Sequence, residues 1–79
     1  MSNEMAEAIV LAVRCIVGAA KDGGINGAPS GVVFAALSAH GMNLTTYTSL
    51  VDTLRTAGVI TQKSNVLYWT GKELSEAFA

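Results

Sequence analysis

Hydroxyl side chains recur along residues 45–56 at spacings that place them on one side of a helix. This side carries the hydroxyls of Thr45, Thr48, Ser49 and Thr56 and the carboxylate of Asp52. Hydroxyls, together with the free N–H groups at a helix N-terminus, can hydrogen-bond phosphate oxygens and other anionic groups. We therefore expect a polar, nearly uncharged surface that carries a single carboxylate and is suited to binding rather than to catalysis.

Other residues with chemical potential lack the partners that catalysis or metal binding would need. His40 and Ser38 lie on different sides of one predicted helix, so they do not form a nucleophile–base pair. Cys15 is the only cysteine and His40 the only histidine, which excludes a disulfide framework and a zinc cluster. The glycines at 23–31 are not followed by Gly-Lys-Ser/Thr, so no phosphate loop is predicted. We expect no enzymatic activity, no cofactor and no metal.

Composition limits the chain to one small, apolar-rich domain. It has 79 residues, 51% of them hydrophobic and 14% charged, with a formal net charge of −1. This charge gives no overall attraction to nucleic acid or to an anionic membrane. Acidic residues precede the apolar stretch 6–20 and charges interrupt it, which disfavours a signal peptide and a membrane span. The chain is expected to be soluble and cytoplasmic.

The first predicted element is a helix over residues 3–21 that is apolar around most of its circumference. Such a helix is usually buried on more than one side. Cys15 is expected to be a small buried hydrophobe. One flank is predicted to pair with a second chain in a homodimer through Ala6, Val10, Val13 and Val17.

A loop over residues 22–29 and a second helix over residues 30–40 are predicted next. The loop is rich in Gly, Asn and Pro, with Ile25 as a buried anchor. Ser30 is the expected N-cap of the second helix, and Gly41 is expected just past its end. The core-facing residues of this helix are expected to be Val33, Phe34 and Leu37.

The third predicted helix covers residues 43–57, with Asn43 as N-cap and Gly58 beyond its end. Its inward residues repeat at three and four: Tyr47, Leu50, Val51 and Leu54. Period-two patterns then predict a β-hairpin over residues 59–70, joined by residues 62–65. A short helix or tail over residues 71–79 completes a mainly α chain with a small antiparallel β-hairpin.

The segments HGMNLTTYTSLVDTLRTAGVI and VLYWTGKEL carry a resemblance to a known family. Together they resemble the turn, recognition helix and wing of winged helix-turn-helix transcription regulators of the MarR or PadR kind. The matching positions are Leu54, Gly58, Val59, Ile60, Thr70 and Leu74, while Gly71 stands one or two positions early. The resemblance spans roughly residues 30–74 and concerns packing and capping residues, so it implies a winged helix-turn-helix fold.

The resemblance implies double-stranded DNA as the partner, with the third helix in the major groove. Residues expected to contact DNA are Asn43, Thr45, Thr46, Thr48, Ser49 and Lys63. Asp52 would oppose phosphates, and Arg55 and Lys63 are the nearby bases, so weak binding by a dimeric regulator is expected. The alternative is a winged helix used for protein recognition through the neutral hydroxyl face, the aromatic strand at Tyr68 and Trp69, or the apolar first helix.

Overall fold

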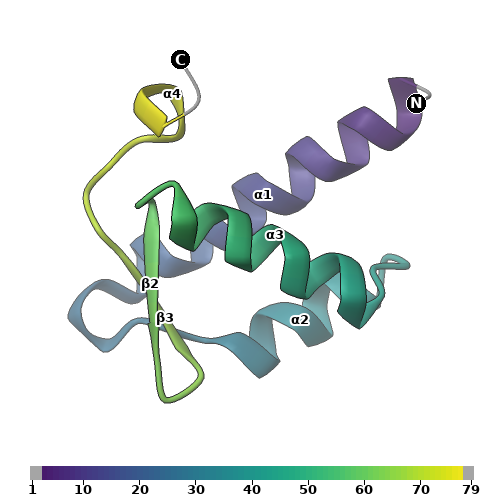
Figure 1. Ribbon diagram of the computed structural model, residues 1–79. Helices are drawn as coiled ribbons and strands as arrows, with labels where there is room; N and C mark the ends of the chain where they lie inside the picture. The colour runs from purple at the N-terminus through teal and green to yellow at the C-terminus, as the bar shows by residue number, and fades with distance from the viewer. Residues whose placement is uncertain (1–2, 78–79) are drawn as a thin grey trace.

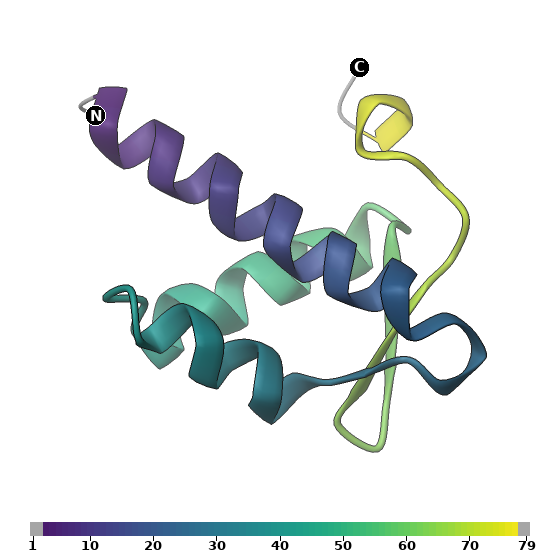
Figure 2. The same ribbon diagram turned by 180° about the vertical axis from the view of Figure 1, so that it is seen from behind.

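Four α-helices, one short 3-10 helix and three short strands make up the described part of the chain, residues 3–77 of a computed structural model. The long helix α1 (Asn3–Gly23) is followed by η1 (Gly24–Asn26) and β1 (Ala28–Pro29). The helices α2 (Ser30–Ser38) and α3 (Leu44–Thr56) come next, then β2 (Ile60–Lys63), β3 (Val66–Trp69) and α4 (Leu74–Ala77). Helix α3 lies in front of α1 in Figure 1, and α1 lies in front in the reverse view of Figure 2. The prediction of a mainly α chain with a small antiparallel sheet is confirmed.

The core lies where α1, α2 and α3 meet the sheet. Its fully buried large side chains are Ile16, Leu54, Val59, Ile60 and Leu67. Tyr47, Val51 and Leu54 point inward from α3, as their spacing predicts, because three- and four-residue steps return to one side of a helix. Val33 is buried, and Phe34 and Leu37 pack against the same core, which confirms the predicted inner face of α2.

Short local signals end α2 and begin α3 as predicted. Gly41 has φ +96°, and the Met42 N–H donates to the Leu37 carbonyl (3.2 Å) across it. Asn43 is the N-cap of α3, where its side-chain oxygen accepts from the Thr46 N–H (2.8 Å). At the other end of α3, Gly58 has φ +81°, and the Val59 N–H donates to the Leu54 carbonyl (3.0 Å). Both helices are slightly shorter than predicted. Helix α2 ends at Ser38 rather than at residue 40, and α3 spans 44–56 rather than 43–57.

The hairpin is tighter than predicted. Gln62 pairs with Leu67 and Lys63 with Val66, so only Ser64 and Asn65 form the turn instead of residues 62–65. Both turn residues have positive φ (53° and 63°), the backbone that lets a two-residue turn follow the twist of its strands. The alternation of side chains marks the strands, but it does not decide how far the pairing extends toward the turn.

The prediction of a loop over residues 22–29 is wrong in three respects. Helix α1 continues to Gly23, a turn of 3-10 helix follows, and Ala28–Pro29 form a strand that pairs with Leu67 and Val66 of β3. The sheet order is therefore β1-β3-β2. Pro29 fits an edge strand because it has no N–H to donate. A strand of two residues has no periodicity that a sequence pattern could reveal.

Three side chains have surroundings different from those predicted. Ile25 is 96% exposed rather than a buried anchor, and Cys15 is exposed on α1 rather than buried. Ser30 is the first residue of α2, not its cap; Pro29 occupies the cap position without a side-chain bond. Two further predictions from the sequence, Ser2 as an alternative N-cap of the first helix and Phe78 as an apolar residue of the C-terminal segment, fall outside the described residues.

Candidate nucleic-acid interface

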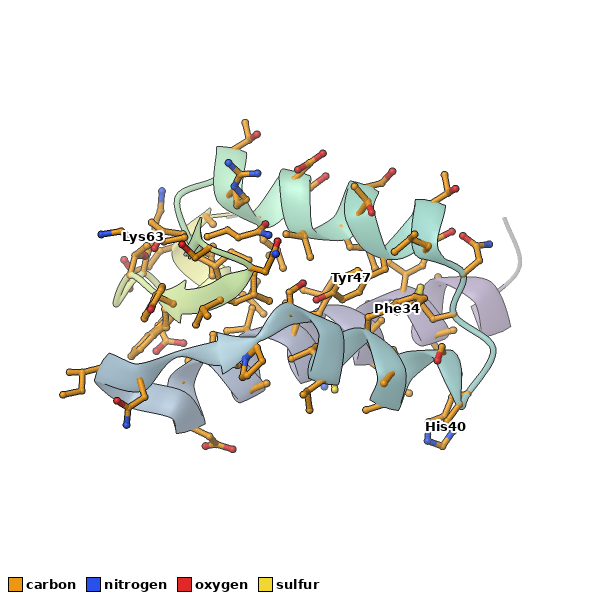
Figure 3. All side chains as sticks on the ribbon, turned by 90° about the horizontal axis from the view of Figure 1, so that it is seen from below. Phe34, His40, Tyr47 and Lys63 are labelled. Atoms are coloured by element: carbon orange, nitrogen blue, oxygen red, sulfur yellow. The ribbon has the colours of Figure 1, made fainter. Side chains whose placement is uncertain are left out.

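The outer side of α3 carries the candidate interface. Its exposed polar residues are Thr45, Thr48, Ser49, Asp52, Thr53, Arg55 and Thr56. Thr45, Ser49, Asp52 and Thr56 follow one another at three and four, so they form one line opposite the buried side of the helix. Figure 3 shows side-chain oxygens projecting outward along this helix. The sequence therefore located the hydroxyl face correctly.

The predicted contact residues do not all share this face. Asn43, Thr45, Thr48 and Ser49 are exposed around the first two turns of α3. Thr46 is half-buried and lines a groove against α1, so its side chain lies off the outer line. Lys63 is exposed at the end of β2, beside the hairpin turn, where Figure 3 shows it projecting away from the helices.

Tyr47 anchors α3 to α2 from the opposite side of the helix. Its hydroxyl donates to the Ser30 carbonyl (3.1 Å) and lies 2.8 Å from Ser30 Oγ, which is then placed to donate in return. The Phe34 and Tyr47 rings lie 5.2 Å apart between their centroids and are tilted by 53° (Figure 3). Burial raises the pKa of the Tyr47 phenol above its ordinary value, while the hydrogen bond from Ser30 lowers it in part. These contacts fix the position of α3 relative to α2, and with it the position of the exposed side of α3.

Charge is sparse on this surface and partly neutralised within the chain. Arg55 lies 3.4 Å from the Asp52 carboxylate, one turn earlier on α3. Lys72 donates to the Ala57 carbonyl (3.0 Å) at the C-terminal end of the same helix. Lys63 takes part in no ion pair within residues 3–77. The Arg55–Asp52 pair is exposed, so it can open at small cost when a phosphate approaches.

A shallow depression joins α3 to the hairpin. It is lined by Asp52, Arg55, Thr56, Ile60, Thr61 and Gln62. The outer face of α3 and the hairpin are thus continuous along one side of the molecule, with Arg55 between them. An elongated ligand could contact both.

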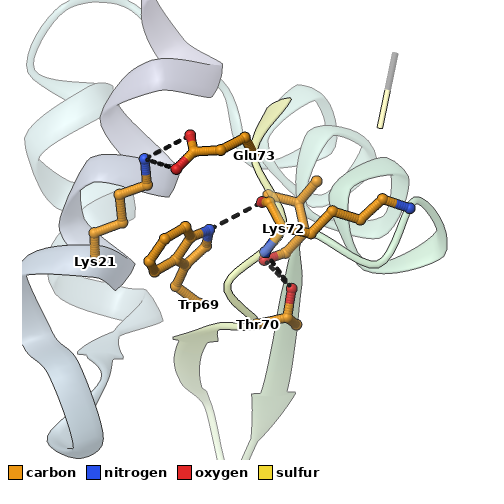
Figure 4. A network of polar contacts seen from close by, with 6 residues as sticks. Lys21, Trp69, Thr70, Lys72 and Glu73 are labelled. Carbon is orange, nitrogen blue, oxygen red and sulfur yellow. Dashed lines mark hydrogen bonds and ion pairs between the residues drawn. The ribbon is translucent and has the colours of Figure 1, made fainter. Parts of the chain in front are cut away.

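Trp69 of β3 contacts both the end of α1 and the segment before α4. Trp69 is half-buried, and its indole N–H donates to the Lys72 carbonyl (3.0 Å). The Lys21 ammonium lies 4.6 Å from the centroid of the Trp69 ring and 3.0 Å from a carboxylate oxygen of Glu73 (Figure 4). Tyr68 is half-buried as well, whereas alternation along a strand predicts one of the two in the core and the other exposed to solvent or at an interface.

The predicted dimer residues of α1 differ in how accessible they are. Val10 is 48% exposed, Ala6 and Val13 are half-buried, and Val17 is 3% exposed within the core of its own chain. Val17 therefore offers no surface to a partner. Because nearly the whole circumference of α1 is apolar, the sequence did not show which side faces the core.

Sequence reasoning missed Ser30 as the partner of Tyr47 and β1 as part of the sheet. Both depend on contacts between distant parts of the chain. The Asp52–Arg55 ion pair, by contrast, could have been predicted from the sequence, because residues three apart on a helix are neighbours.

Comparison with known proteins adds no assignment, because no protein-family model, curated protein or solved structure matches the chain. Within residues 3–77, no cluster of His, Cys, Asp and Glu is arranged to hold a metal ion. None of the helices in this part of the chain has the length and hydropathy of a membrane span.

Proposed function

We propose that this protein is a cytoplasmic winged helix-turn-helix regulator that binds double-stranded DNA with the first turns of α3 in the major groove. The observation that carries the proposal is the hydroxyl-rich outer face of α3, which is exposed while the opposite side is fixed by Tyr47. The element order and the sheet order β1-β3-β2 support it, because they place a hairpin beside the second helix of a helix–turn–helix pair.

Hydrogen bonding, not charge, provides most of the proposed contacts. Thr45, Thr48 and Ser49 can donate to base edges or phosphates, and threonine methyl groups can contact the thymine methyl. The first N–H groups of α3 that lack intrahelical acceptors point the same way as the helix dipole, which favours a phosphate. Arg55 and Lys63 then contact the backbone at either side of the groove.

This small number of cations gives the proposal a quantitative signature. If Arg55 and Lys63 each neutralise one phosphate, the logarithm of the binding constant falls with the logarithm of salt concentration with a slope of about −1.8 per chain. A protein that neutralises roughly six to ten phosphates would have a much steeper slope, of about −5 to −9. Lys63→Gln should reduce the slope by about 1 per chain and weaken binding to all sequences alike.

The test is a fluorescence-anisotropy titration at low salt with a duplex selected from a random pool. Thr48→Glu should weaken binding at least about tenfold, because it places a carboxylate where phosphates and base oxygens approach. Asn26→Glu is the matched control, since it adds the same charge at an exposed residue of η1. Flat titrations with both selected and genomic duplexes, or equal losses in the two variants, would contradict the proposal.

Protein recognition is the second candidate function. It is favoured by the near-neutral face of α3, where Leu44 is 61% exposed, and by an apolar groove of about 550 Å³ between α1 and the α2–α3 turn. The groove is lined by Ala8, Ile9, Leu11, Ala12, Cys15, Leu37, His40, Gly41, Met42, Asn43 and Thr46. Comparing the DNA selection with a pull-down from the native host distinguishes the two: enrichment of one polypeptide without enrichment of any duplex would favour this candidate.

A further inference from the structure

The side of α1 that faces away from the core forms a surface of its own. We call it the outer face of α1 and define it by Ala6, Glu7, Val10, Leu11 and Arg14, which together line one shallow depression. Val10 is 48% and Leu11 65% exposed, so two adjacent large apolar side chains are left in contact with water. Gly18 continues the same side of the helix, and nothing lies within 4 Å of the position that a Cβ would occupy there.

Two opposite charges flank this apolar pair symmetrically. Glu7 and Arg14 are seven residues apart, close to two helical turns, so they share one side of α1 about 10.5 Å apart along its axis. Val10 and Leu11 lie midway between them. Both charged side chains are exposed, and neither takes part in an ion pair within the described residues.

We propose that the outer face of α1 binds a second copy of this chain, with the two α1 helices antiparallel and a two-fold axis passing near Val10 and Leu11. In this arrangement Glu7 of each copy lies opposite Arg14 of the other, and the apolar pairs meet at the centre. A two-fold interface requires one patch to complement itself, and this patch does so. Parallel pairing would instead oppose Glu7 to Glu7 and Arg14 to Arg14, so the charge pattern selects the antiparallel orientation.

The interface does not compete with the candidate DNA surface. Helix α3 faces the viewer in Figure 1, whereas α1 faces the viewer in Figure 2. Val10 and Arg14 share a depression with Thr53 at the edge of α3, but not with Thr45, Ser49, Asp52 or Thr56. A partner seated on the outer face of α1 therefore lies beside Thr53 and leaves the line of Thr45, Ser49, Asp52 and Thr56 uncovered. The argument uses only residues of α1 and holds whether or not the protein binds DNA.

A charge-swap series measured by sedimentation equilibrium tests the proposal without DNA. The wild-type chain should reach about twice its monomer mass of 8.2 kDa, and its dissociation constant should rise with salt. Glu7→Lys and Arg14→Glu should each raise the dissociation constant at least about tenfold, because each replaces two attractive contacts with two repulsive ones. The double variant Glu7→Lys/Arg14→Glu should return it to within about threefold of wild type.

The rescue is specific because Glu7 and Arg14 form no ion pair with each other within one chain. Asp22→Lys, an exposed position near the other end of α1, is the matched charge control and should leave the dissociation constant unchanged. A wild-type chain that stays monomeric at low salt, or a double variant as weak as the single variants, would overturn the proposal.

An apolar pair of variants tests the centre of the interface. Leu11→Asp should weaken dimerisation at least about tenfold, whereas Val32→Asp on α2 should not change it. The two residues are almost equally exposed, at 65% and 66%, so the fold should tolerate both substitutions. Equal weakening by both variants would place the interface elsewhere and overturn the proposal.

Discussion

The phenol of Tyr47 sets the position of α3, because it carries the hydrogen bonds between the buried side of that helix and the start of α2. Burial raises the pKa of this phenol, so the folded state retains its proton at pH values where the unfolded state, with an ordinary value near 10, has begun to lose it. The stabilisation is therefore complete below about pH 10 and is lost as the pH rises through the higher folded value.

The variant Tyr47→Phe measures the contribution of the phenol hydrogen bonds to stability separately from that of the ring packing. At neutral pH it should lower the free energy of unfolding by about 1 kcal/mol, because the ring packing stays but both hydrogen bonds to Ser30 are lost. Above pH 10 it should also reduce the loss of stability with pH. Urea unfolding at neutral and alkaline pH measures both effects. Tyr68→Phe is the control and should keep the wild-type alkaline decline; an unchanged decline in Tyr47→Phe would show that another group causes it.

Residue-level predictions from the sequence succeeded where the signal is local. Asn43 as a cap, Gly41 and Gly58 at positive φ, and Tyr47, Val51 and Leu54 as inward residues all follow from neighbours within one turn. The predicted burial of Cys15 and Ile25 was wrong because burial is not a local property. Hydrophobicity alone does not show which side of an apolar helix or loop the rest of the chain covers.

At the scale of elements, the entry of β1 into the sheet depends on Gly27. This residue has φ 69° and ψ −170°, a backbone conformation essentially restricted to glycine. It also lies against β3: an added Cβ would stand 2.5 Å from Val66 Cγ1 and 2.7 Å from the Leu67 carbonyl oxygen. No side chain fits there unless β1 and β3 move apart.

Gly27→Ala should therefore lower the free energy of unfolding by about 2–4 kcal/mol, combining backbone strain with overpacking. Gly24→Ala is the matched control, because Gly24 also has positive φ (55°) but nothing lies within 4 Å of the position that a Cβ would occupy there. That variant should cost only about 1 kcal/mol. Chemical denaturation of both variants measures the difference, and equal costs would show that the close approach to β3 contributes nothing.

The elements themselves were predictable to different degrees. Helix α3, the turn before it and the hairpin follow from periodicity and capping, and so does the exposed hydroxyl face of the candidate site. Strand β1 was not predictable, because its pairing is decided by β3, about forty residues after β1 begins. The two-residue hairpin turn was not predictable either, because the alternation of side chains does not show how far β2 and β3 pair toward the turn. The sequence also did not show that the Lys72 ammonium is held at the end of α3 by the Ala57 carbonyl, because this contact joins separate elements.

On the scale of the whole molecule, the cluster around Trp69 links the end of α1 to the sheet and to the segment before α4 (Figure 4). Lys21 contributes from α1, Trp69 from β3 and Glu73 from the C-terminal segment. Trp69 also packs against the hydrophobic core. Since Trp69 is the only tryptophan, its fluorescence reports on this junction alone, whereas far-UV circular dichroism reports mainly on the helices.

If the junction and the helices share one core, their unfolding transitions in urea should coincide, as in a two-state domain. Glu73→Gln should keep the transitions coincident and lower the free energy of unfolding by less than about 1 kcal/mol, because the Lys21–Glu73 pair is partly exposed to solvent. Trp69→Phe, followed by circular dichroism, should cost more, since it removes the indole hydrogen bond and part of the packed ring. A fluorescence transition at lower urea than the helical one would contradict this view, because the sheet and C-terminal segment would then unfold as a unit separate from the three helices.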